Sequence, residues 1–542
     1  MYCFVPSWYS GQHPFHADAE ENARRKQADE FDDTVNQLRM FLQAKEDVQL
    51  LSLAYAPNLR HFMYRQNILT VPVWSAFDVL QGVRRQSPGL LSFRDLPWPE
   101  YTQWFYTPFG VSAYLNGQPI AMIGFGRDGN MILVDHLQER RIVQRDWYDD
   151  RGFLSSCVIY EGERAVRQEY LDPAGNVRLA ENLLTGSVSI PPDFRNEFAG
   201  VEYPSMQELL REVLSGYLHS SDLQDAKLVV ASNAVHNDLV FRSLAEQPVT
   251  LSYFGERFDL NSQYALSQDV SRSRMIVSDT EHTAKRIRAV QGEAGGVPIY
   301  DISPFDTRLS LGKSQQIKAL KVFLPIDGFK GEYLEKALAQ TAAFMKDHAS
   351  VELHLGVQTT DFAYAGRVRR WIGSILMGLG YPELAIAPLP DPGGQEEGPE
   401  GPGGEQSPLE TLMGAAGDGL PPRVFIRTYA GETELIQILR DVRLIVDVRD
   451  QPDLYLQIAG ISTGIPQVNY RFTRYVEHCK NGFIIQNIDH LTEGLDYYLS
   501  GLNHWNEALV YCIQEIERYR GGALVTKWKE MERDAAGAGT GE

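Results

Sequence analysis

The sequence predicts an α/β protein with two parallel-sheet domains, the first of them interrupted by an antiparallel insertion. Short apolar strands alternate with amphipathic helices at the start of the chain and again after residue 320. Between residues 103 and 190 the helical periodicity disappears and turn dipeptides join strand-like runs. At 542 residues the chain is too long for one ordinary core, which also indicates several domains.

The first α/β domain is predicted to begin at the N-terminus. Residues 2–6 and 48–57 have the composition of strands, and residues 32–45 between them carry apolar side chains at helical spacing. Asp32 or Asp33 is expected to cap this helix. A strand, a helix and a second strand in this order favour parallel pairing. The same alternation returns near residue 195 and ends near residue 305.

The insertion is predicted to be an antiparallel meander. Turn glycines recur every 23 residues, at Gly129, Gly152 and Gly175, each with an Asp or Asn close by. Such turns adopt positive φ, so each repeat is expected to be a β-hairpin. A sheet of this kind either serves packing alone or offers its free face to a peptide or partner protein.

The second α/β domain is predicted to begin near residue 313 and to contain a Gly/Pro/acid-rich disordered loop at residues 388–408, because that stretch buries too little apolar surface. Two C-terminal helical segments are expected to return to the first domain. The predicted boundaries in chain order are 1–102 for the first part of domain one, 103–192 for the meander, 193–312 for the second part of domain one, 313–500 for domain two, 501–530 for the C-terminal helices and 531–542 for a disordered tail.

Composition excludes several classes of protein. The net charge of −20 argues against nucleic-acid binding, which needs clustered Lys and Arg. Four widely spaced cysteines give no metal-ligand or redox motif, and no cofactor is predicted. The N-terminus lacks the pattern of a signal peptide, and no run of about 20 apolar residues is present, so a cytoplasmic protein is expected.

Residues 451–468, QPDLYLQIAGISTGIPQV, follow a buried strand and resemble the donor motif of GT-B glycosyltransferases. In retaining members of that class, two glutamates separated by seven residues hold the donor sugar and its ribose. Counting back from Gly464 and Pro466 places these positions on Gln451 and Ala459. A glutamine can still bond to a hydroxyl, whereas an alanine cannot.

Of the two cations expected beside the donor diphosphate, one is also replaced. The arginine that the resemblance implies after the first strand of domain two falls on Pro325, and the lysine falls on Lys330. Loss of the arginine removes a charge-assisted contact to phosphate. Lys330 is either a phosphate ligand or a solvated lysine at a helix start. The motif therefore predicts a GT-B-like fold of two facing Rossmann-like domains without the donor carboxylates.

Other candidate sites carry weaker patterns. The loop that begins at Ser232 follows a strand, but no neighbouring motif supports a nucleophile there. Two basic clusters are either solvated helix faces or contacts to a lipid headgroup or partner. They comprise Arg367, Arg369 and Arg370 in one cluster, and Lys285, Arg286 and Arg288 in the other.

Four blocks, at residues 1–10, 31–41, 96–110 and 149–156, resemble the first of the accessory Sec proteins, which export serine-rich-repeat glycoprotein adhesins in Gram-positive bacteria. The resemblance implies a GT-B-like fold with an inserted meander and no demonstrated sugar transfer. It implies a cytoplasmic complex with the second and third accessory Sec proteins, cooperation with the accessory SecA motor, and contact with anionic membrane lipid in some members.

The sequence therefore predicts a non-catalytic component of the accessory Sec export complex for glycosylated adhesins, with a degenerate glycosyltransferase fold as a binding scaffold. Two alternatives stay open. One is an active glycosyltransferase with rearranged donor contacts, since inverting GT-B enzymes do not all need both glutamates. The other is a residual module that binds the glycan of the adhesin without turning it over.

Overall fold

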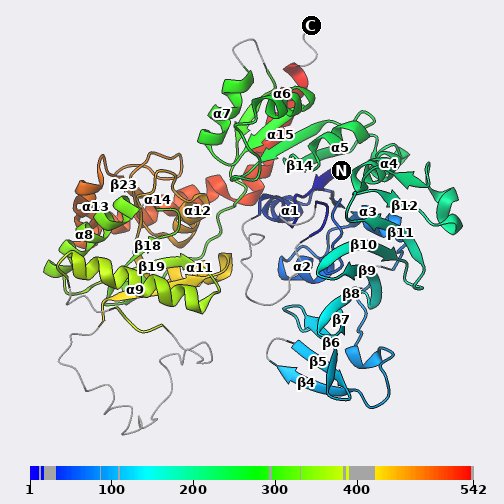
Figure 1. Ribbon diagram of the computed structural model, residues 1–542. Helices are drawn as coiled ribbons and strands as arrows, with labels where there is room; N and C mark the ends of the chain where they lie inside the picture. The colour runs from blue at the N-terminus through cyan, green and yellow to red at the C-terminus, as the bar shows by residue number, and fades with distance from the viewer. Residues whose placement is uncertain are drawn as a thin grey trace. The chain divides into compact units, whose positions relative to one another are not determined.

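The computed structural model describes residues 1–10, 14–17, 32–85, 87–107, 110–291, 296–329, 331–381, 386–389 and 422–538. The described chain forms two compact units (Figure 1). Unit 1 contains the described residues up to Phe305 together with those from Gly521, and unit 2 contains those from Asp306 to Arg520. Nearly all of the predicted loop at 388–408 lies outside the described residues.

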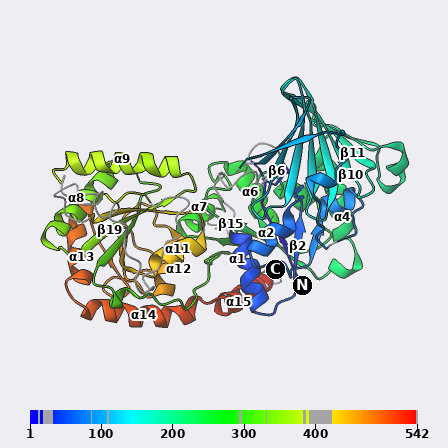
Figure 2. The same ribbon diagram turned by 90° about the horizontal axis from the view of Figure 1, so that it is seen from below.

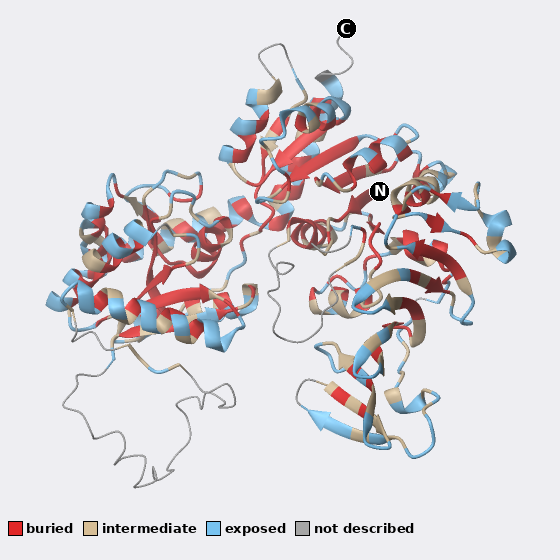
Figure 3. Ribbon diagram, in the orientation of Figure 1, coloured by how far each residue is buried: buried red, intermediate tan, exposed pale blue. Residues whose placement is uncertain are grey.

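Unit 1 is built on a seven-stranded parallel sheet, which confirms the α/β class predicted for the start of the chain. Its order is β17-β16-β15-β14-β1-β2-β3, so the direction of strand addition reverses between β1 and β14. Its strands are almost wholly buried, because helices flank a sheet of this kind (Figure 3). The strands are β1 (Tyr2–Val5), β2 (Val48–Ser52), β3 (Val73–Ser75), β14 (Lys227–Ala231), β15 (Val249–Tyr253), β16 (Met275–Ser278) and β17 (Ile299–Asp301).

The helices of unit 1 follow the predicted pattern at their termini. Asp32 is the N-cap of α1 and accepts a hydrogen bond from the Val35 amide, as the sequence predicted. The helices are α1 (Asp33–Gln43), α2 (Leu59–Arg65), α3 (Ala76–Leu80), α4 (Met206–Leu218), α5 (Asn237–Ser243), α6 (Gln263–Arg272), α7 (Glu281–Gln291) and α15 (Gly521–Ala538).

Helix α15 packs on α1 and extends further than the sequence predicted. Residues 531–538, expected in a disordered tail, continue the helix to Ala538. Glu532 explains the extension, because its carboxylate accepts hydrogen bonds from the Tyr2 hydroxyl at 2.8 Å and the Lys227 ammonium at 2.7 Å. The ring of Trp528 meets that of Phe41 edge-on at 5.5 Å between centroids. The C-terminal helix is thus bonded to the first residues of β1 and β14 in the parallel sheet of unit 1.

The insertion forms a ten-stranded antiparallel sheet in simple meander order from β4 to β13 (Figure 2). The predicted turn glycines have φ of 77° at Gly129, 83° at Gly152 and 88° at Gly175, which confirms the hairpins. The sheet continues beyond the predicted end at 192. Its strands are β4 (Gln103–Thr107), β5 (Gly110–Leu115), β6 (Gln118–Phe125), β7 (Met131–Gln138), β8 (Arg141–Asp149), β9 (Phe153–Glu161), β10 (Arg164–Leu171), β11 (Val177–Asn182), β12 (Val188–Ser189) and β13 (Glu202–Tyr203).

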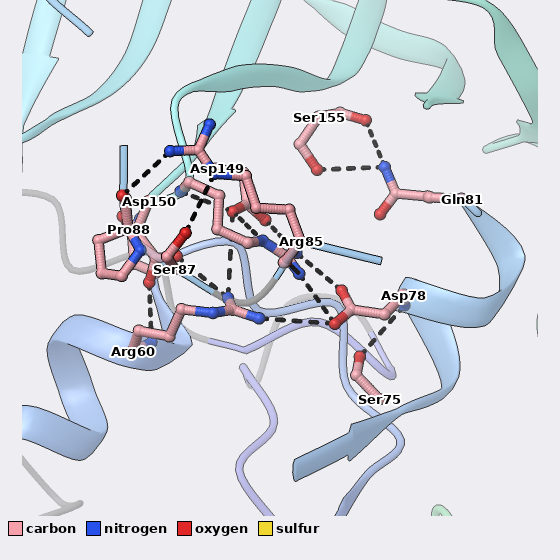
Figure 4. Close-up of polar contacts among 12 residues, drawn as sticks. Arg60, Ser75, Asp78, Gln81, Arg85, Ser87, Pro88, Asp149, Asp150 and Ser155 are labelled. Carbon is pink, nitrogen blue, oxygen red and sulfur yellow. Dashed lines mark hydrogen bonds and ion pairs between the residues drawn. The ribbon is translucent and has the colours of Figure 1, made fainter. Parts of the chain in front are cut away.

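A buried ionic network joins this sheet to the α/β part of unit 1 (Figure 4). Arg60 of α2 donates to Asp150 at 3.0 Å, and Arg151 donates to Asp149 at 2.6 Å and to Asp78 of α3 at 2.7 Å. Arg60 is 8% exposed and Arg151 only 3%. Buried charges of this kind need their partners. The block at 149–156, singled out in the sequence, therefore has an anchoring role.

Unit 2 is built on a six-stranded parallel sheet of order β20-β19-β18-β21-β22-β23. Its strands are β18 (Leu320–Pro325), β19 (Val351–Gln358), β20 (Val424–Tyr429), β21 (Val442–Asp447), β22 (Gln467–Asn469) and β23 (Gly482–Ile484). Its helices are α8 (Gly331–Asp347), α9 (Phe362–Gly378), α11 (Glu432–Leu439), α12 (Leu454–Thr463), α13 (Leu491–Leu499) and α14 (Asn503–Tyr519). The order reverses between β18 and β21, which places the topological switch point there.

Candidate functional site

The carboxyl ends of β18 and β21 are where an open parallel sheet of this order would hold a ligand. The loop after β18 begins with Ile326 and Asp327, and the loop after β21 runs from Val448 into the N-terminus of α12. This edge of unit 2 contains the residues that the sequence singled out as a donor motif. The side chains at this edge therefore decide what the site can bind.

A single ion pair closes the switch point. Arg449 donates from Nε to Asp447 Oδ1 at 2.7 Å and from Nη2 to Asp447 Oδ2 at 2.6 Å. Its third nitrogen, Nη1, donates to the Asp327 carbonyl at 3.0 Å and so ties the two loops together. Burial alone would lower the pKa of Arg449, but the Asp447 carboxylate holds that pKa above its ordinary value. The guanidinium therefore carries a positive charge, and the Asp447 carboxylate already neutralises that charge.

The N-terminus of α12 is also occupied by the chain itself. Asp453 is the N-cap residue, and its carboxylate accepts from the Leu456 amide at 2.7 Å. The Asp453 amide donates to Asp447 Oδ2 at 2.9 Å. Helix N-termini bind phosphate through amides of this kind. Here two aspartates stand where a diphosphate would need positive charge, so the local electrostatics oppose an anion.

The two predicted donor positions lie in different environments. Gln451 is exposed in the loop between β21 and α12. Ala459 is 2% exposed and packs in an apolar cluster with Phe323, Leu456 and Ile465. A carboxylate at this position would enter the core of unit 2 rather than solvent. The structure therefore gives Ala459 a packing role.

The surviving Gly-x-Pro element forms a turn. Gly464 has φ of 73° and ends α12 in the left-handed conformation, where glycine is favoured. An added Cβ there would come within 2.3 Å of Leu509 Cδ1 of α14, so the position also needs the small residue. Pro466 is buried, and its carbonyl accepts from the Ile445 amide at 3.1 Å. Both residues shape the approach to β22.

The predicted cation positions contribute no phosphate ligand that the structure describes. Pro325 is the buried last residue of β18 and lies beside Gly356 in the register with β19. Lys330 lies outside the described residues.

The two basic clusters occur on helices of different units. On α9, Arg369 donates to the Ile386 and Ala387 carbonyls at 2.9 Å each, whereas the Arg367 side chain is 59% exposed and Arg370 is also exposed. On α7 all three cations have partners. Lys285 lies 3.8 Å from Glu281, Arg286 donates to Asn261 at 2.8 Å, and Arg288 donates to the Ile299 carbonyl at 3.0 Å.

The corresponding edge of the sheet in unit 1 is closed by neutral contacts and by Arg257, which is paired with Asp33 and donates to the Ser232 carbonyl at 3.0 Å. The Asn233 amide donates to Ser7 Oγ at 2.7 Å, which joins the loops after β14 and β1. The Tyr9 hydroxyl and His236 Nδ1 share a hydrogen bond of 2.9 Å. Burial, with a smaller contribution from the Arg257 charge, lowers the pKa of His236 to about 3, so the ring is neutral near pH 7. Ser232 is buried and accepts from Asn237, which fits a structural role.

Sequence reasoning missed the residues that close the switch points. Asp447 ends a buried strand directly after three apolar residues, and a buried carboxylate indicates a nearby partner. That signal was present in the sequence. It could not show whether Arg449 would face Asp447 or a ligand, because both residues follow the same strand end.

Neither a metal-ligand cluster nor a membrane-spanning helix is present within the described ranges. No group of three or more His, Cys, Asp or Glu side chains is arranged to hold a metal ion. None of the described helices has the length and hydropathy needed to cross a membrane.

Comparison with known proteins identifies close relatives. The family model of the first accessory Sec system protein matches residues 1–377 and 417–535. The curated family member from Streptococcus gordonii is 34% identical over 543 residues, with 99% of each chain covered. A crystal structure of accessory secretory proteins 1, 2 and 3 from Streptococcus pneumoniae contains a chain with a TM-score of 0.80 and 29% identity, covering 99% of this chain and 100% of that one.

A more distant likeness concerns the fold alone. The pneumococcal O-GlcNAc transferase GtfA, solved in complex with UDP and GlcNAc, has a TM-score of 0.68 at 10% identity, with 99% of each chain covered. This likeness confirms the predicted GT-B-like fold. At such low identity it carries no statement about activity.

Proposed function

Because the chain belongs to the family of the first accessory Sec system protein, we propose that it is a non-catalytic component of the export complex for glycosylated serine-rich-repeat adhesins. In this role the glycosyltransferase fold serves as a binding scaffold. The observation that carries the non-catalytic part is the Asp447–Arg449 pair at the switch point of unit 2.

A donor diphosphate would have to compete with this pair. To reach Arg449 it must displace a buried carboxylate that makes two short charge-assisted hydrogen bonds. The displaced Asp447 would then lie unpaired beside the phosphate, and Asp453 would add a second negative charge at the α12 N-terminus. Like charges at close range disfavour the bound state. Poor donor binding follows from this arrangement.

The partners follow from the relatives. The pneumococcal structure holds accessory secretory proteins 1, 2 and 3 together, which supports assembly of this chain with the second and third accessory Sec proteins. From membership of the family we also propose the accessory SecA motor and the adhesin substrate as partners, on the cytoplasmic side of the membrane. The net charge of −20 restricts contact with anionic lipid to a local patch, for which Arg367 and Arg370 on α9 are the exposed candidates.

Co-purification tests the assembly directly. The full chain, tagged and co-expressed with the second and third accessory Sec proteins, is expected to elute as one stoichiometric complex. A variant with Asp447→Leu and Arg449→Met together should assemble equally well, because it removes both charges of the pair and the switch point is not expected to contact a partner. A folded chain that elutes alone would overturn the proposed role.

The donor-like motif at residues 451–468 leaves one second candidate open, a chain that still binds or modifies the glycan of the adhesin. A transfer assay with UDP-GlcNAc and an adhesin acceptor separates the two, with GtfA as the active control. We expect no product from this chain. Glycan binding without transfer, measured with serine-linked or threonine-linked GlcNAc, would identify the residual binding module.

A further inference from the structure

Strand β4 is an uncovered sheet edge. It is the terminal strand of the ten-stranded sheet, and within the described ranges no strand pairs with its outer side. Phe105 and Tyr106 are 52% and 59% exposed, and the strand carries the colour of exposed residues in Figure 3. Terminal strands present backbone N–H and C=O groups that can pair with another chain.

Each of the other terminal strands that the structure describes has a feature that prevents pairing with a strand of another chain, and β4 has none of these features. Four of them have only two or three residues, namely β3, β13, β17 and β23. The remaining one, β20, contains Arg427, and its Val424 is bridged by Ile386. Short length, a charge or a covering segment prevents edge-to-edge pairing. Strand β4 has five residues, no charge, no proline and an unbroken register with β5.

The aromatic side chains of β4 are already held in place. The Trp104 ring packs edge-on against Phe93 at 4.8 Å and Trp98 at 5.2 Å. On the opposite face, the Phe105 ring lies 4.8 Å from that of Tyr114. The Tyr106 hydroxyl accepts from Arg94 at 2.6 Å. Side chains fixed before association lose little freedom when a partner strand arrives.

The side chains along β4 are self-complementary when two copies of the strand pair antiparallel. In an antiparallel pair centred on Phe105, Trp104 lies opposite Tyr106 of the second copy, and Phe105 lies opposite its own counterpart. Every one of these cross-strand pairs is aromatic, and none brings charges together. We propose that β4 pairs with β4 of a second copy of this chain about a two-fold axis through Phe105. The interface is isologous and joins two ten-stranded sheets.

Sedimentation velocity on the full chain tests the pairing. Between about 1 and 100 µM the mass is expected to rise from 61.1 kDa toward twice that value. Phe105→Lys should remain monomeric throughout, because two ammonium groups would meet at the axis. Met122→Lys is the matched control, since Met122 is 51% exposed but lies on β6, away from the edge. It should dimerise like the unaltered chain.

Disulfide trapping tests the register. With Cys479→Ser as the background, Phe105→Cys should form a covalent dimer when oxidised glutathione is added, because opposed residues of an antiparallel pair lie about 4.5–5.5 Å apart. Trp104→Cys faces Tyr106 of the second copy and should not cross-link.

Three results would overturn the inference. The first is a chain that stays monomeric at every concentration, and the second is a dimer or trimer that Phe105→Lys leaves intact. The third is a monomeric chain that binds another accessory Sec protein and loses that binding in the Phe105→Lys variant. This result would assign the β4 edge to that protein.

Discussion

The two parallel sheets reverse their strand order in the same manner, and an arginine–aspartate pair lies at each switch point, but unit 1 adds neutral side-chain hydrogen bonds between its loops. In unit 1 the loops after β1 and β14 are joined by neutral hydrogen bonds, between Asn233 and Ser7 and between Tyr9 and His236. In unit 2 an ion pair does so, with Arg449 held by Asp447 and bonded to the Asp327 carbonyl. At both edges the arginine side chain is thus paired within its own unit.

Each unit holds a largely buried arginine against an aspartate near the carboxyl edge of its sheet. Arg257 in unit 1 pairs with Asp33 at 2.5 and 2.9 Å, as Arg449 in unit 2 pairs with Asp447. The Asp32 carboxylate lies 4.0 Å from Arg257 in addition to that of Asp33, whereas Asp447 is the one carboxylate within ion-pair distance of Arg449 among the described residues. Under the proposed function, neutralised cations at both sheets leave the glycosyltransferase-like fold to serve as a scaffold. The difference in acid count predicts different responses to pH and mutation.

Ala459→Glu should have the largest effect, because it places a carboxylate in the apolar cluster of unit 2. We expect the free energy of unfolding to fall by about 4 kcal/mol or more. Urea denaturation followed by circular dichroism measures this. Gln451→Glu at the exposed position is the matched control, with a change within about 0.5 kcal/mol. Equal stability of both variants would mean that Ala459 faces a solvated site.

Asp447→Ala should come next, because it leaves the Arg449 guanidinium buried without its carboxylate. A loss of about 3–5 kcal/mol is expected in the same denaturation assay. The control is Asp450→Ala, which removes a pair with Arg471 whose side chains are 43% and 49% exposed, and should cost less than about 1 kcal/mol.

A double variant sharpens this result. Replacing both Asp447 and Arg449 by leucine and methionine removes the two charges together, so much of the lost stability should return. If the single Asp447 variant were as stable as the Asp450 variant, the proposed closure of unit 2 by an ion pair would be wrong.

Tyr9→Phe tests the neutral closure of unit 1. The change removes the hydroxyl bonded to the buried His236 and leaves Nδ1 without that partner. A loss of about 1–3 kcal/mol is expected from thermal or urea unfolding. Tyr264→Phe removes a hydroxyl from a side chain that is 79% exposed and should change little. If Tyr9→Phe left the free energy of unfolding unchanged, the hydrogen bond between Tyr9 and His236 would not stabilise unit 1.

Asp32 should give a separate effect on stability, one that depends on pH. Burial and then the Asp33 carboxylate raise the pKa of Asp32 from 3.8 to about 7. The folded chain therefore binds this proton more tightly than the unfolded chain, and stability should fall as the pH rises from about 4 to about 7. Since one pKa unit corresponds to about 1.4 kcal/mol, the free energy of unfolding should fall by about 3 kcal/mol over this range.

Asp32→Asn keeps an N-cap acceptor for α1 and should flatten this dependence. Unfolding measured at pH 5 and pH 7.5 gives the slope, and exposed Asp225→Asn is the control. An unchanged slope in the Asp32 variant would show that Arg257 neutralises both acids of unit 1.

The sequence was sufficient for features that depend on local pattern. The hairpin turns at Gly129, Gly152 and Gly175 follow from residues that favour positive φ, and the N-cap of α1 follows from the placement of Asp32. Alternation of apolar runs was enough to identify two parallel sheets and the meander between them.

The parts that could not be predicted depend on contacts between distant residues. Spacing put Ala459 at a donor position, but only the packing of α12 shows that its methyl group enters the core. Small residues suggested a frayed tail, whereas Glu532 binds Tyr2 and Lys227 from the other end of unit 1. The direction in which Arg449 turns is a tertiary fact that no linear pattern encodes.

The most direct test of the account is calorimetric titration of UDP-GlcNAc into the full chain, with GtfA as the positive control. We predict no saturable binding up to about 1 mM, because Asp447 already occupies Arg449. Saturable micromolar binding that Arg449→Met abolishes and Arg471→Met retains would contradict the account.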